Sequence, residues 1–211
     1  MLPSLNERLS RLPSDLQPLS DAAWQHRLRG ANLRSDGTVQ VAPMPWVSGE
    51  AFAFVLYPPA EPAWIAALRF RVGEALPDSY ARLLAALNGC FAFGLALYGL
   101  APSLQPGARR SDRHALEPLD LEAANRYWAH EYRGAEGDFH FGGCSWTATE
   151  NVGYFLTPAG RYLCRRKDGD VLREWGSLRE LLAEELPAAE ARDRERLTSR
   201  TWPWELRRGT A

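Results

Sequence analysis

The pattern of apolar and polar positions is clearest in residues 76–100, LPDSYARLLAALNGCFAFGLALYGL. The first half of this stretch has apolar residues at the i, i+3, i+4 and i+7 spacing of one helix face, namely Tyr80, Leu83, Leu84 and Leu87. Pro77 and Asp78 suit a helix start, since proline needs no partner there and aspartate accepts from free amides. Asn88-Gly89 is typical of a helix end. The pattern therefore predicts a helix that stops at residues 88–89.

The same stretch changes to a period of two from Phe91 onward. One face would carry large residues, namely Phe91, Phe93, Leu95 and Leu97. The other face would carry mostly small ones, namely Ala92, Gly94 and Ala96, followed by Tyr98. Because successive side chains of a strand point to opposite faces, this alternation predicts one strand. We expect a helix-to-strand corner at the centre of the core, with room for close packing on the small face.

The first 59 residues are interpreted as an N-terminal extension of short helices and a hairpin. Residues 6–12 and 22–28 could form helices, and residues 38–47 and 51–57 read as strands joined by a turn at 48–50. Pro58-Pro59 then breaks the chain. A helix is predicted from Glu61 to residue 72. Residues 101–118 form a predicted long loop, and Asp120 is a predicted N-cap for a helix with the apolar stripe Leu121, Ala124, Trp128 and Tyr132.

The C-terminal third reads as an antiparallel meander followed by a helix. Predicted strands lie at 139–143, 152–156, 161–166 and 171–175, and Asp168-Gly169 is a strong hairpin signal. Ser177 and Glu180 form a predicted capping box for a helix that Pro187 would end. The charged, Trp-containing tail 188–211 fits either a solvated helix followed by a Trp-Pro-Trp clip or partial disorder. The predicted fold class is α+β, an antiparallel sheet of about four to six strands with helices packed against it.

Composition narrows the partners that we expect. A formal net charge of −1 gives no general attraction to nucleic acid. Lys167 is the only lysine, and no arginine cluster for phosphate is visible. The three cysteines Cys90, Cys144 and Cys164 are widely spaced, which favours buried, reduced thiols. No apolar run is long enough for a signal peptide or a membrane span, so we expect a cytoplasmic protein without nucleic-acid or membrane partners.

The residues that could act in catalysis or bind a metal do not form a recognisable motif. His130-Glu131, His140 and Cys144 lack the spacing of a zinc site, so we interpret the histidines as structural or surface residues. The Cys144 thiol lacks an identifiable orienting group. No phosphate loop is present, and Gly142-Gly143 instead indicates a bulge or close backbone approach. The basic stretch 109–113 is interpreted as a solvated loop. We therefore predict no catalytic residue, cofactor or metal.

The segment 128–150 is the best candidate for partner binding. Aromatic and acidic residues gather in and beside it: Glu122, Trp128, Glu131, Glu136, Asp138, Trp146 and Glu150. Aromatic side chains rimmed by carboxylates could bind a basic protein partner. The alternative is that the aromatic residues belong to the core and the carboxylates to a helix exterior.

With these motifs in place, the chain resembles the SUKH superfamily over about residues 60–187. The resemblance rests on LPDSYARLLAALNG followed by a strand and LYGL, then on DLEAANRYW, FHFGG, GYFLTPAGRY and a capped terminal helix. This group includes fungal cell-wall synthesis regulators and bacterial immunity proteins. The resemblance implies structural roles for the family's recurrent residues, here Leu76, Pro77, Tyr80, Asn88, Gly89, Gly142 and Gly143.

The resemblance also implies a function. It implies a non-enzymatic protein-binding domain, in bacteria an immunity protein that neutralises a toxin encoded beside it. An alternative is a regulator or scaffold of the same fold whose partner is linked to the cell envelope or to phage. A third, less favoured hypothesis is a hydrolase or metalloenzyme at Cys144, His140 and His130. The chain departs from the family in its first 59 residues, its loop at 101–118 and its tail.

Overall fold

The computed structural model describes residues 4–48, 51–72, 76–105, 117–147 and 149–199, and the α+β class is confirmed. Nine strands form one antiparallel sheet in chain order. They are β1 (Ala31–Leu33), β2 (Val39–Pro43), β3 (Phe52–Leu56), β4 (Cys90–Ala92), β5 (Leu95–Leu97), β6 (Phe139–Ser145), β7 (Asn151–Leu156), β8 (Tyr162–Arg165) and β9 (Val171–Trp175). The predicted count of four to six strands was too low, because β3 pairs with β4 and so joins the N-terminal strands to the same sheet.

The second reason for the low count lies in residues 90–97, which form a hairpin instead of one strand. Phe93 and Gly94 both take a positive φ, +50° and +85°, and make the two-residue turn. Phe91 therefore pairs with Ala96, and Ala92 pairs with Leu95. A left-handed turn of this kind is typical of tight hairpins, and Gly94 was its signal in the sequence. The alternating pattern concealed the turn because both strands are largely buried.

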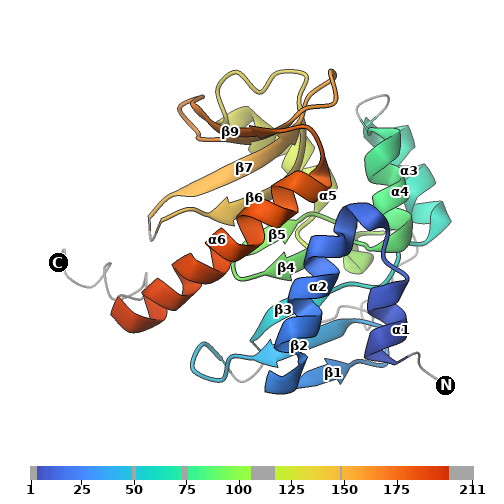
Figure 1. The fold of residues 1–211 in the computed structure, drawn as a ribbon. Coiled ribbons are helices and arrows are strands. Elements are labelled where there is room, and N and C mark those ends of the chain that lie inside the picture. The colour runs from blue at the N-terminus through green and yellow to red at the C-terminus, as the bar shows by residue number, and fades with distance from the viewer. Residues whose placement is uncertain (1–3, 49–50, 73–75, 106–116, 148, 200–211) are drawn as a thin grey trace.

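Helices cover the sheet unevenly (Figure 1). On one face lie α1 (Leu5–Ser10), α2 (Gln17–His26) and α6 (Leu178–Ser199), and α2 packs against α6. The predicted helices at 61–72 and 77–87 are observed as α3 (Pro62–Val72) and α4 (Asp78–Ala86). Short helical turns complete the chain: η1 (Ser14–Leu16), η2 (Arg27–Arg29) and η4 (Pro102–Leu104). The core lies between the sheet and these helices, with Phe54, Leu84 and Tyr154 among its fully buried residues.

The helix α6 continues through Pro187, so the prediction that this proline ends the helix was wrong. A proline inside a helix removes one hydrogen bond and destabilises it by about 3 kcal/mol. Contacts beyond Pro187 offset this loss, because Arg192 donates to the Cys144 sulfur at 3.2 Å and Arg196 to the Ser145 carbonyl at 2.9 Å. Of the predicted tail, residues 188–199 therefore belong to α6. The Trp-Pro-Trp sequence and the basic stretch 109–113 lie outside the described residues.

The segment after Asp120 is helical but irregular. The Asp120 carboxylate accepts from the Ala123 amide at 2.7 Å, as expected of an N-cap. The predicted helix is split into α5 (Leu121–Ala123), a π-helical turn η6 (Ala124–Trp128) and a 3₁₀ turn η7 (Ala129–Glu131). Inside η6, the Asn125 side-chain Nδ2 donates to the backbone carbonyl of His140 at 2.9 Å. Its Oδ1 accepts from the backbone N–H of His140, also at 2.9 Å. This side chain ties the irregular segment to β6.

The Gly142-Gly143 pair lies at a bulge and a close approach, as predicted. The register of β6 against β7 shifts between His140 and Gly142. A Cβ atom on Gly142 would lie 2.6 Å from the Ala96 carbonyl oxygen, and one on Gly143 would lie 2.7 Å from the Tyr98 hydroxyl. Because these atoms leave no space for a side chain, the centre of the sheet requires glycine at positions 142 and 143.

We expect Gly142→Ala to lower the free energy of unfolding by about 2 kcal/mol, because the Ala96 carbonyl cannot move without disturbing the sheet. Urea denaturation would measure this loss. The control is Gly176→Ala, where the nearest atom is the flexible Glu180 carboxylate at 3.3 Å and a change of about 0.5 kcal/mol is expected. Equal effects of the two substitutions would contradict this packing.

Candidate functional site

The face of the sheet opposite α6 bears a hollow of about 470 Å³, here named the β5–β6 hollow. The lining residues are Phe91, Gly94, Ala96, Tyr98, Leu119, Trp128, Glu131, Tyr132, His140, Gly143, Cys144, Ser145, Asn151, Val152 and Lys167. The predicted partner-binding residues Trp128 and Glu131 are among them. The hollow is therefore the concave feature on which we build the candidate site.

Small residues make the floor of this hollow. Ala96 of β5 pairs with Gly143 of β6, and Gly94 lies in the turn that precedes β5. The neighbouring pairs Leu95–Cys144 and Leu97–Gly142 point to the other face, because side chains alternate along a strand. The predicted small face of Ala92, Gly94, Ala96 and Tyr98 is not kept as one face. The hairpin pairs Phe91 with Ala96 and Ala92 with Leu95, so Phe91 joins the lining of the hollow and Ala92 does not.

Aromatic rings form much of the wall. Trp128 and Tyr132, on η6 and just after η7, lean over the sheet beside Tyr98. The Tyr98 and Trp128 ring centroids are 5.6 Å apart at an interplanar angle of 78°. The Tyr98 hydroxyl makes no hydrogen bond to another described residue and lies above Gly143. Burial raises the pKa of this phenol, so it stays protonated.

His140 is the buried polar group of the site. Its residue is 1% exposed, its ring stacks on Phe155 with centroids 4.4 Å apart, and Tyr98 and Tyr132 meet it edge-on. Burial lowers the pKa of His140 to about 4, against a smaller opposing effect of the Ala124 and Gly142 carbonyls. Within the described chain neither ring nitrogen has a hydrogen-bond partner of good geometry. The imidazole is therefore neutral at physiological pH.

The rim of the hollow carries the ion pair between Glu131 and Lys167. Their side chains are 50% and 57% exposed. An exposed pair of this kind contributes about 0–1 kcal/mol and can exchange partners readily. The only lysine of the chain thus lies at the edge of the candidate site.

The other predicted carboxylates are mostly paired with arginines. Glu122 bonds Arg71 at 2.6 Å and Arg126 at 3.0 Å, Asp138 bonds Arg165 at 3.2 Å, and Glu150 bonds Arg166 at 2.9 Å. Glu136 is exposed and forms no ion pair with a described residue. The carboxylates are thus distributed around η6, η7 and the β6–β8 loops, and their charges are largely balanced within the chain.

Trp146 lies on the α6 face, away from Trp128. Two guanidinium groups lie over its ring, Arg173 at 5.3 Å and Arg192 at 4.8 Å from the centroid. The structure therefore brings Trp128 and Glu131 to one hollow and places Trp146 in a separate network. His140 and Cys144 of the metalloenzyme hypothesis both line the hollow, but their side chains have different partners: the Cys144 sulfur accepts from Arg192 of α6, and the His140 ring stacks on Phe155.

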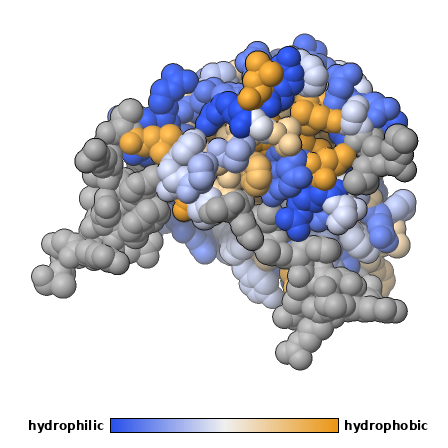
Figure 2. All heavy atoms as spheres, turned by 90° about the horizontal axis from the view of Figure 1, so that it is seen from below, coloured by the Kyte–Doolittle hydropathy of each residue, from blue (hydrophilic) through white to orange (hydrophobic). Residues whose placement is uncertain are grey.

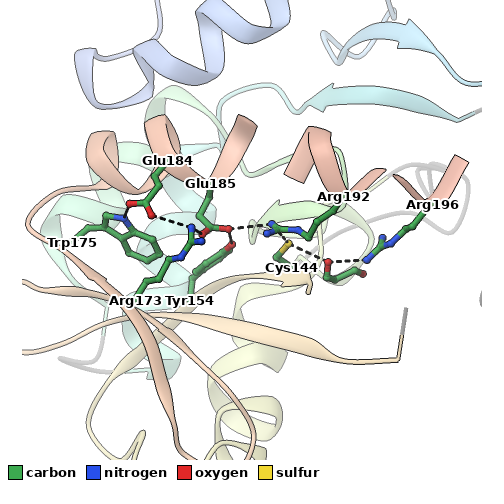
Figure 3. A network of polar contacts seen from close by, with 9 residues as sticks. Cys144, Tyr154, Arg173, Trp175, Glu184, Glu185, Arg192 and Arg196 are labelled. Carbon is green, nitrogen blue, oxygen red and sulfur yellow. Dashed lines mark hydrogen bonds and ion pairs between the residues drawn. The ribbon is translucent and has the colours of Figure 1, made fainter. Parts of the chain in front are cut away.

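A buried carboxylate organises the polar network between α6 and the strands (Figure 3). Glu185 of α6 has no exposure to solvent and accepts from the Tyr154 hydroxyl at 2.9 Å. It also pairs with Arg173 at 2.7 Å and Arg192 at 3.1 Å. The neighbouring Glu184 accepts from the Trp175 indole at 2.7 Å and remains 54% exposed. Sequence reasoning missed this network, because Glu185 resembles any other charged residue of a helix.

The three thiols are free and buried, as predicted. Burial raises the pKa of Cys90 to about 12 and raises that of Cys144, where Arg192 partly opposes the effect. No group of three or more potential metal ligands occurs within the described residues. In that same part of the chain, no helix combines the length and the apolar character needed to cross a membrane.

Apolar side chains also reach the surface at the end of the molecule that carries β1 and β2, viewed from below in Figure 2. Leu28 is 87% exposed, and Trp46 is 47% exposed beneath the Arg29 guanidinium at 6.0 Å. Arg27 similarly lies over Trp24 at 4.0 Å. Because the chain's own arginines already lie over both indoles, the β5–β6 hollow is the stronger candidate for recognition.

Comparisons of the chain with models of protein families, with curated proteins and with solved structures find no match.

We expect Glu185→Gln to lower the free energy of unfolding by about 3 kcal/mol, since it leaves the Arg192 and Arg173 charges without their buried partner. The matched control is Glu184→Gln at the next position, for which the expected loss is about 1 kcal/mol or less because that side chain is half exposed. Thermal or urea unfolding measures both. A smaller loss for Glu185→Gln than for Glu184→Gln would contradict the assigned network.

The depressed pKa of His140 predicts acid sensitivity. The unfolded chain binds a proton near pH 6.5, whereas the folded chain binds it only near pH 4, so stability falls as the pH drops through this window. The full effect corresponds to about 3 kcal/mol. His140→Phe keeps an aromatic ring on Phe155 and has no proton to bind, so we expect its unfolding free energy to fall less over that pH range. Parallel acid dependence in both proteins would show that His140 is not the responsible group.

Proposed function

We propose that the protein is a non-enzymatic protein-binding domain, a bacterial immunity protein of the SUKH type that neutralises a cognate toxin in the cytoplasm by direct binding. Two observations support this proposal. The sequence motifs of residues 60–187 resemble that family, and the β5–β6 hollow provides a concave surface on the face opposite α6. The strands β1–β3 extend the same sheet, so the N-terminal residues 1–59 would support this domain.

The hollow is the observation that carries the proposal. Energetically important residues of protein interfaces are anchor side chains that fill well-packed pockets, and tyrosine and tryptophan are enriched around them. The hollow has a small-residue floor at Ala96 and Gly143, and aromatic walls at Tyr98 and Trp128. The exposed pair Glu131–Lys167 would supply the polar rim. Binding at this face would mask the active site of the toxin by covering it.

Filling the hollow tests the proposal. Ala96→Leu places a larger side chain at the floor of the hollow, where Ala96 is 4% exposed, so we expect partner affinity to fall by about a hundredfold. The matched control is Ala191→Leu, the same change on the exposed surface of α6. The measurements are titration calorimetry with the toxin encoded beside the gene and growth rescue when that toxin is expressed.

The two variants distinguish an effect on recognition at the hollow from a general effect on folding. Loss of binding and rescue in Ala96→Leu alone, with unchanged unfolding of both variants, supports recognition at the hollow. Unchanged binding in Ala96→Leu would place recognition elsewhere. If the neighbouring toxin does not bind the unmodified protein, the immunity role fails. Capture of a cell-envelope or phage protein that Ala96→Leu loses would then favour the regulator or scaffold alternative.

A further inference from the structure

We propose that the β5–β6 hollow is a receptor for one arginine side chain of the partner, whose guanidinium group lies in the hollow against the Trp128 ring, beside Tyr98, and pairs with Glu131. The proposal rests on the proposed function in assigning this arginine to a partner protein. It identifies the chemistry of the guest, which the resemblance does not.

The walls favour a flat cation. The faces of aromatic rings carry negative electrostatic potential and attract cations that lie within about 6 Å. The aromatic side chains of Trp128, Tyr98 and Phe91 line the hollow beside the small floor. A guanidinium is planar and weakly hydrated, so it can stack on such rings more favourably than an ammonium group. The chain already uses this contact twice at Trp146, where Arg173 and Arg192 lie over the ring.

The polar groups of the lining also favour a hydrogen-bond donor as the guest. The Tyr98 hydroxyl lies above Gly143 in the lining, and the neutral His140 ring has no hydrogen-bond partner of good geometry at either nitrogen within the described chain. The carboxylate of Glu131 is an acceptor at the rim. An apolar guest would leave these groups unpaired, and an anionic guest would meet Glu131. A guanidinium has five donor hydrogens in one plane and can serve several of these acceptors together.

Lys167 is the competitor of the guest for Glu131. It is the only lysine or arginine among the described lining residues, and it pairs with Glu131 while the hollow is empty. An incoming guanidinium would replace Lys167 at Glu131, and the lysine would leave the ion pair while staying at the rim that the partner covers. The exchange is easy because both side chains of the present pair are about half exposed. Lys167 is therefore a competitor for Glu131. Substitution of Glu131 and substitution of Lys167 should change the affinity for arginine in opposite directions.

The experiment titrates the full chain with N-acetyl-arginine N-methylamide and follows the backbone amide signals of Ala96 and Gly143 by NMR. We expect a dissociation constant on the order of 1 mM for this fragment of an interface. Glu131→Gln should weaken binding about tenfold, since it removes a charged hydrogen bond. Lys167→Met should strengthen it several-fold by removing the competitor. The neutral isostere N-acetyl-citrulline N-methylamide should bind about tenfold more weakly than the arginine probe.

Opposite effects of Glu131→Gln and Lys167→Met support the receptor, since a purely structural ion pair would give effects of the same sign. Any of three results would overturn it: no shift at Ala96 and Gly143 up to about 50 mM probe, equal binding of citrulline and arginine, or weakening by both substitutions. If the toxin binds at the hollow while the probe does not, this inference fails and the proposed function stands. If the probe binds as expected and the toxin does not, the immunity role fails while the guanidinium site remains.

Discussion

The carboxylate of Glu185 is the interaction on which the arrangement of the sheet and α6 depends. It has no contact with solvent, and it accepts from Tyr154 of β7, from Arg173 of β9 and from Arg192 of its own helix. A buried charge is tolerated only when such partners surround it. The carboxylate therefore fixes where α6 crosses the strands. The hollow at β5 and β6 lies on the opposite face.

Much of the fold follows from local pattern. The helix at residues 78–86, the meander from β6 to β9 and the buried thiols were predictable, because each depends on spacing, turn chemistry or residue type nearby. Long-range pairing was not predictable in the same way. The union of β3 with β4 and the continuation of α6 through Pro187 depend on contacts between segments far apart in sequence. The Phe93–Gly94 turn was hidden because burial on both strands imitates one continuous strand.

The site shows the same division. Trp128 and Glu131 were candidates from the sequence, yet their meeting with Ala96 and Gly143 in one hollow depends on the register of β5 with β6. Lys167 joins them from the β8–β9 hairpin, and nothing in its local sequence indicates this position. Trp146 satisfied the same compositional rule as Trp128 but lies among the arginines of the Glu185 network. Composition identifies candidate residues, whereas strand pairing decides which of them share a face.

The most direct test of recognition at the hollow uses its single lysine as a reporter. Lys167 is half exposed at the rim, so an amine-reactive acetylating reagent should modify it in the free protein, and mass spectrometry gives the rate. Ala191→Lys introduces a reference amine on the exposed surface of α6. We expect saturation with the partner to slow acetylation of Lys167 strongly and to leave the reference amine unaffected. An unchanged rate at Lys167 in the complex would contradict recognition at this site.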